Sequence, residues 1–182
     1  MQFSEAGAVN TQATLEAASH RARELGILEV VVATTTGETA FKALELFRDA
    51  RLIAVTYHCG FRQPFERVMP LETQKKLQQK GVEVVSATHT LSGLERSVAQ
   101  RYQGTYPVLV MADTLRLFGQ GTKVAVEVAV MAADAGVLSG ADIIAIGGTA
   151  KGVDAAIVVK PAHMNNFFDL RIREVICKPS HF

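Results

Sequence analysis

A cluster of hydroxyl side chains in VVATTTGETA, residues 31–40, could bind a phosphate group. An apolar β-branched run precedes the cluster and a helical pattern follows it, so the cluster lies at the start of a predicted helix. The first backbone amides of a helix have no partner inside it and lie at the positive end of its dipole. The candidate phosphate site combines these amides with Thr34, Thr35, Thr36, Gly37 and Thr39.

The same loop allows an interpretation without a ligand. Thr35 and Glu38 have the spacing of a capping box, in which the two side chains close the helix start themselves. The loop also lacks the lysine of the nucleoside-triphosphate motif and the glycine spacing of the dinucleotide motif. A phosphate site and a simple helix cap therefore stay open as alternatives.

Small, hydroxyl or imidazole residues also follow the other predicted strands. The carboxyl ends of parallel strands meet at one edge of a sheet, where ligands of α/β proteins bind. A histidine there could contact a ligand or only bond a loop carbonyl, and two histidines without a third donor predict no metal site. The candidates that would line the rest of the ligand site are His58, Gly60, His89, Gly147, Gly148 and Thr149.

Lys123 and Glu127 lie four residues apart at the start of a helical pattern that is apolar on nearly every side, residues 124–137. A buried carboxylate needs a partner, so the two side chains either pair with each other or present Glu127 to the ligand as an acceptor or base. Lys123, Glu127 and His58 are the possible proton handlers, and the sequence identifies no catalytic residue.

The elements that would position these residues alternate between strand and helix. A helix is expected from Asn10 to Leu25, with Gly26 as its stop, and a second after the threonine loop, with Ala40, Ala43, Leu44 and Phe47 on one face. A third is expected over residues 71–80. Two or three helices are expected between residues 91 and 137. The connection before the last predicted strand is too short for a crossover helix, which predicts antiparallel pairing there. The predicted strands are residues 28–33, 52–56, 82–85, 142–146 and 155–159, and residues 171–177 form either an edge strand or a tail.

Composition limits the class of protein. A chain of 182 residues with 48% apolar residues predicts one domain over residues 1–182. A net charge of +1 without charge clusters gives no footprint for nucleic acid or an anionic membrane, and neither partner is expected. Two cysteines and the lack of an apolar leader or long apolar span predict a reduced, cytoplasmic setting.

Several motifs together resemble the stand-alone pyruvate-kinase C-terminal-domain-like family of archaea and bacteria. The matching motifs are TTTGETA, THTLSG (88–93), FGQGTKVAVE (118–127), MAADAG (131–136) and NNFFDLR (165–171). This resemblance spans nearly the whole chain. It implies a three-layer α/β/α fold with a mixed five-stranded sheet, mostly parallel, in which the last strand is antiparallel.

The resemblance also implies a ligand. In pyruvate kinases the corresponding loop binds the phosphate of an allosteric effector, although Glu38 stands where arginine is frequent and disfavours a sugar bisphosphate. Members of the stand-alone family resemble binders of flavin mononucleotide (FMN), so FMN or a similar phosphorylated small molecule is the expected ligand. Because 182 residues leave no room for a catalytic barrel, we do not expect a pyruvate kinase.

Two further functions remain alternatives, and the sequence does not decide between enzyme and binding domain. The first is a small flavin-dependent oxidoreductase. The second is a regulatory or assembly module that associates through the sheet edge or a helical face, and a homo-oligomer is possible. The physiological ligand and the pathway are not predicted.

Overall fold

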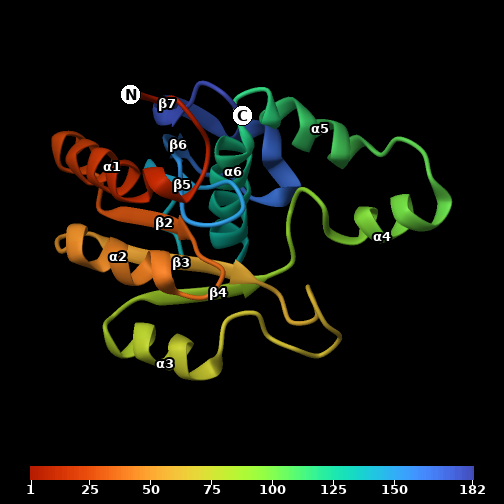
Figure 1. The fold of residues 1–182 in the computed structure, drawn as a ribbon, viewed down its shortest axis with the longest axis horizontal. Helices are drawn as coiled ribbons and strands as arrows, with labels where there is room; N and C mark the ends of the chain where they lie inside the picture. Colours follow the sequence, from red (N-terminus) through yellow and green to blue (C-terminus); the bar gives the residue numbers. More distant parts are fainter.

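A seven-stranded sheet runs through the computed structural model, which describes residues 1–182 (Figure 1). The strand order is β1-β7-β6-β5-β2-β3-β4. The strands are β1 (Gln2–Phe3), β2 (Glu29–Ala33), β3 (Arg51–Tyr57), β4 (Glu83–Ala87), β5 (Ile143–Gly147), β6 (Ala155–Lys160) and β7 (Arg171–Pro179). Only β6 runs against its neighbours, since it pairs antiparallel with both β5 and β7 while every other pairing is parallel.

The mixed, mostly parallel α/β class is confirmed, and so is the antiparallel pairing of β5 with β6. The expected number of five strands is wrong, because β7 and β1 add two. β1 has two residues, too few to show a pattern in the sequence. β7 pairs with β6 through two register shifts, which interrupt the alternation of side chains that marks a regular strand.

Helices cover both faces of this sheet, with α1, α2 and α3 on one face and α6 on the other (Figure 1). The α-helices are α1 (Thr11–Leu25), α2 (Glu38–Leu46), α3 (Leu71–Gln79), α4 (Gly93–Tyr102), α5 (Pro107–Arg116) and α6 (Gln120–Asp134). Two short 3₁₀ helices are η1 (Ala8–Asn10) and η2 (Met164–Asp169). Helix α4 buries none of its residues and projects with α5 to one side of the molecule.

Successive residues of the central strands point to opposite faces of the sheet. In β2, Val30 and Val32 belong to the hydrophobic core under α1 and α2, whereas Val31 belongs to the core under α6. All three are fully buried. Burial on both faces explains why these strands appear in the sequence as continuous apolar runs.

Two glycines bring α6 close to the sheet. A Cβ atom added to Gly147 at the end of β5 would lie 2.1 Å from the carbonyl oxygen of Gly121 in α6. One added to Gly121 would lie 2.1 Å from Oδ1 of Asp154. Any larger residue at either position would push the helix away, and this contact fixes where the first turns of α6 lie.

No helix in the structure combines the length and the apolar character needed to cross a membrane.

Candidate functional site

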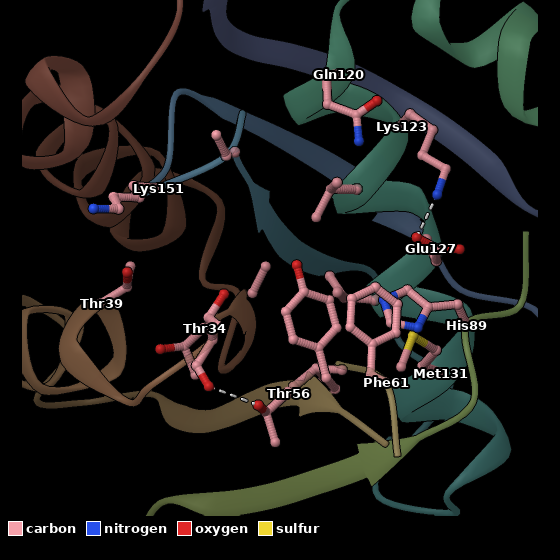
Figure 2. A pocket seen from close by; sticks show the side chains of 18 of the residues that line it. Thr34, Thr39, Thr56, Phe61, His89, Gln120, Lys123, Glu127, Met131 and Lys151 are labelled. Carbon is pink, nitrogen blue, oxygen red and sulfur yellow. Dashed lines mark hydrogen bonds and ion pairs between the residues drawn. The ribbon is translucent and has the colours of Figure 1, made fainter. Parts of the chain in front are cut away.

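A cavity of about 540 Å³ lies where β2, β3, β4 and β5 end (Figure 2). Its lining includes Thr34 after β2, Tyr57 at the end of β3, His89 after β4 and Gly148 after β5. Helix α6 supplies a further wall. The parallel strand ends therefore meet at one rim, as the pattern of the sequence predicts.

The threonine loop forms one side of this cavity, lined by Thr34, Thr35, Thr36 and Thr39. Inside the loop the Gly37 amide donates to Oγ1 of Thr34 at 3.1 Å. The amide of Thr34 donates to the carbonyl of Val55. The amides that donate to no atom of the chain belong to Thr35, Thr36, Glu38, Thr39 and Ala40. Five unused donors at the positive end of α2 can bind an anion.

The capping box does not form. No side chain caps the start of α2, and Glu38 instead pairs with Lys42 at 2.9 Å, one turn into the helix. Gly37 is the N-cap residue with φ of 100°, a left-handed conformation that favours glycine. A Cβ at Gly37 would lie 2.6 Å from Thr73, so this glycine faces α3 rather than the cavity.

Three rings stack beside the threonine loop. The Tyr57 and Phe61 rings lie 4.1 Å apart with an angle of 2° between their planes. His89 stacks on Phe61 at 4.9 Å, and His58 meets Phe61 edge-on at 5.5 Å. Tyr57, Phe61 and His89 line the cavity and give it a flat aromatic surface.

Cations outnumber carboxylates in the lining. Arg62, Arg96 and Lys151 have no carboxylate partner in the chain, and Arg96 lies over the Phe61 ring at 5.7 Å. The lining carboxylates, Glu38 and Glu127, are each paired with a lysine. The cavity therefore has an unneutralised positive charge that suits an anionic ligand.

Lys123 and Glu127 form a buried ion pair on the opposite side of the cavity from the threonine loop (Figure 2). Lys123 Nζ donates to Oε2 of Glu127 at 2.5 Å, and the Leu91 amide donates to Oε1 at 2.9 Å. Burial lowers the pKa of Lys123; the positive charges of Arg116 and Arg96 add to that effect while Glu127 opposes it. The sequence left open whether the two side chains pair with each other or face the ligand site. In the structure they pair with each other and also line the cavity.

His89 stands near this pair. Burial lowers the pKa of its imidazole, and the charge of Glu127 only partly offsets the effect. Nδ1 of His89 is buried and has no hydrogen-bond partner in the chain. A neutral imidazole with an unused ring nitrogen can accept a hydrogen bond from a ligand or donate one to it.

The structure brings together in the cavity most of the residues singled out in the sequence: Thr34, Thr35, Thr36, Thr39, His89, Gly148, Lys123 and Glu127. Five others lie outside the lining: Gly37, His58, Gly60, Gly147 and Thr149. Gly147 packs against α6, and the Gly60 amide closes the following loop by donating to the carbonyl of Glu66.

Several lining residues were not found from the sequence: Tyr57, Phe61, Arg62, Arg96, Arg116, Gln120 and Lys151. Tyr57 is the last residue of β3 and directly precedes His58. Its position at the end of a strand could therefore have identified it as a lining residue. Arg96 and Arg116 come from α4 and α5, whose placement no local pattern determines. Their approach to the cavity is a tertiary effect.

The chain matches a protein-family profile and is similar to solved structures. The profile of the family described as "Pyruvate kinase, alpha/beta domain" matches residues 12–159. A pyruvate kinase of Cryptosporidium parvum in complex with ADP is 16% identical, with 84% of this chain and 24% of that chain covered and a TM-score of 0.42. Another structure of a pyruvate kinase from that organism is also 16% identical, with 85% and 23% covered and a TM-score of 0.38. The chain spans about a quarter of the length of these enzymes.

Proposed function

This chain belongs to the pyruvate kinase alpha/beta domain family, and from that premise and its cavity we propose that it binds a phosphorylated small molecule carrying a flat ring. FMN is the specific candidate. The phosphate would bind at the threonine loop, and the ring would pack against Tyr57 and Phe61.

The two cysteines form no disulfide, which favours a cytoplasmic setting for this single predicted domain.

The observation that carries the proposal is the set of five unused amides at the start of α2. Four of the five belong to the cavity-lining residues Thr35, Thr36, Glu38 and Thr39, and the unpaired cation Lys151 lines the same cavity. Charge-assisted hydrogen bonds from amides to phosphate oxygens are about twice as strong as neutral ones. Glu38 also lines the cavity, and its negative charge is offset by the ion pair with Lys42 at 2.9 Å.

The aromatic stack supports the ring of the ligand. Tyr57 and Phe61 are nearly parallel, so a third planar group can extend the stack with its face exposed to theirs. A cavity of about 540 Å³ is within the usual size range for small-molecule sites. A phosphate at one side and a planar group in the middle together describe a mononucleotide.

The direct test is calorimetric titration of the purified protein with FMN, riboflavin and inorganic phosphate. FMN should bind more tightly than riboflavin, because riboflavin shares the ring and lacks the phosphate. Inorganic phosphate should compete with FMN. Equal affinity for FMN and riboflavin would exclude the threonine loop as the phosphate site, and a lack of FMN binding would exclude FMN as the ligand.

A second candidate function is that of a small flavin-dependent oxidoreductase. It is favoured by the ionisable groups Lys123, Glu127 and His89, which line the same cavity as the ring-binding surface. These groups would supply or accept a proton, and a flavin held at the ring-binding surface would supply the chemistry of hydride transfer. Bleaching of bound flavin by a reducing substrate would support this function, and its absence across candidate substrates would leave plain binding.

Self-assembly is a separate proposal and rests on one edge of the sheet. β1 pairs only with Lys178 and Pro179 of β7, so the outer edge of β7 from residue 171 to residue 175 has no strand beside it. Such an edge can pair with another strand. Light scattering with and without ligand would distinguish a homo-oligomer from a monomeric binding protein.

A further inference from the structure

Lys123 is the one buried lysine of this chain. Its side chain lines the cavity although only 4% of the residue is exposed. Each of the other seven lysines is half-buried or exposed. Burying an ammonium group costs free energy, and a buried lysine contributes neither to solubility nor to surface charge. A functional role would explain why a lysine occupies this position.

The surroundings of Lys123 act on its pKa in opposite directions, and burial is the largest effect. Glu127 is the one carboxylate that contacts it, and Glu127 is also held by the Leu91 amide. Burial lowers the pKa of Lys123, the carboxylate of Glu127 opposes this effect, and the positive charges of Arg116 and Arg96 add to it. An amine that is desolvated and placed near other cations is the usual form of a nucleophilic lysine.

Arg96 gives a clue to the reactant. It lines the cavity, lies over the Phe61 ring at 5.7 Å and has no carboxylate partner in the chain. Arg116 lines the same wall and is held by Asp113 and Gln120. A guanidinium without a partner that lines the same cavity as the buried amine could hold an anionic group of a compound that the amine attacks.

We propose that Lys123 forms an imine with an aldehyde or ketone that carries a carboxylate or another anionic group, and that Arg96 holds this group. This activity goes beyond the proposed binding of a mononucleotide and does not depend on it. Lys123 is the nucleophile, Glu127 the group that moves protons, and Arg96 the group that positions the reactant.

The chemistry balances with these groups alone. The Lys123 ammonium passes a proton to Glu127, and the free amine attacks the carbonyl carbon, so that a C–N bond forms while the oxygen takes the proton from Glu127. Glu127 then removes a proton from the nitrogen and returns it to the hydroxyl group, which leaves as water. The product is an iminium ion, and Glu127 is again a carboxylate.

The test uses the wild-type protein, so it does not depend on a variant that folds. The protein is incubated with limiting glyoxylate and sodium cyanoborohydride, and the modified lysines are identified by peptide mass spectrometry. The proposal predicts that Lys123 is modified first. Solvent exposure alone predicts that Lys123 is modified last, and that result would overturn the proposal.

Two comparisons test the role of the anionic group. Acetaldehyde, which is neutral, should modify Lys123 less selectively than glyoxylate does. Arg96→Gln should reduce modification of Lys123 by glyoxylate and leave modification by acetaldehyde unchanged, whereas the matched variant Arg101→Gln, on the same helix outside the cavity lining, should change neither. Equal modification by both aldehydes would overturn the assignment of Arg96.

These results are independent of the mononucleotide proposal. If FMN binds and glyoxylate modifies only exposed lysines, the inference about Lys123 fails and the proposed function stands. If Lys123 is modified first and FMN does not bind, the proposed ligand fails and the amine chemistry stands.

Discussion

Nζ of Lys123 lies 2.5 Å from Oε2 of Glu127, one turn further along α6, and both side chains are almost completely buried. The two charges hold each other in a helix whose other neighbours are mostly apolar. The Leu91 amide also donates to Glu127 and so ties the segment before α4 to α6. The pair thus contributes to the stability of the cavity wall as well as to its chemistry.

Glu127→Ala should destabilise the protein by about 3 kcal/mol or more, because removing one partner of a buried pair leaves the other charge without compensation. The Leu91 amide would lose its acceptor as well. Urea unfolding followed by circular dichroism measures the change. The double variant Lys123→Met with Glu127→Leu should recover much of the loss, since both charges are then replaced by apolar groups of similar size. A double variant that is less stable than Glu127→Ala would contradict this account.

His89 should make stability depend on pH. Its pKa is lowered from 6.5 by burial, so the unfolded chain binds a proton at a higher pH than the folded protein does. The free energy of unfolding therefore decreases as the pH falls from about 6.5 to the lowered pKa of His89 in the folded protein, and His89 contributes no further loss below that pKa. Urea unfolding from about pH 8 to about pH 5 covers this window. His89→Gln should reduce this loss, whereas the exposed His181→Gln should not; identical pH profiles for the wild type and both variants would exclude His89 as the source.

Thr36→Val combined with Thr39→Val should weaken FMN binding at least about tenfold, because hydrogen bonds to a charged group contribute about 1.5–3 kcal/mol each. Both side chains line the cavity, and valine keeps their shape. Thr105→Val is the matched control, since Thr105 is exposed and lies outside the cavity lining. Calorimetry gives the affinities, and an unchanged affinity in the double variant would remove the hydroxyl groups from the proposed site.

Much of the fold follows from local patterns. The apolar β-branched runs marked five strands, of which β2, β3, β5 and β6 are buried on both faces. Gly26 ends α1 in the left-handed conformation that its position after Leu25 suggests. β1 was not assigned as a strand from the sequence because it is two residues long, and β7 was left open between an edge strand and a tail because it is paired through irregular register. Pairing partners distant in the chain, rather than local pattern, define these two strands.

The candidate site was predictable where it depends on strand ends. Thr34 and His89 follow β2 and β4, and the parallel order of these strands brings both to one rim. Gly147 also ends a strand, but it contacts Gly121 of α6 and does not line the cavity; the lack of a side chain allows this close contact. Arg96 reaches the cavity from a helix with no buried residue, and its position depends on the path of the whole segment between β4 and α6.

Phe61→Leu should weaken binding of FMN and leave binding of inorganic phosphate unchanged, because only FMN has a ring that can stack on this side chain. Stacking of a base on an aromatic side chain contributes about 1–3 kcal/mol, which predicts a loss of affinity of about fivefold to a hundredfold. Phe65→Leu is the matched control, since Phe65 lies in the same loop, is 96% exposed and is not part of the cavity lining. Titration of both variants with FMN and with phosphate separates the ring contact from the phosphate contact. If the two variants bind FMN equally well, the stack of Tyr57 and Phe61 packs the loop and does not bind a ring.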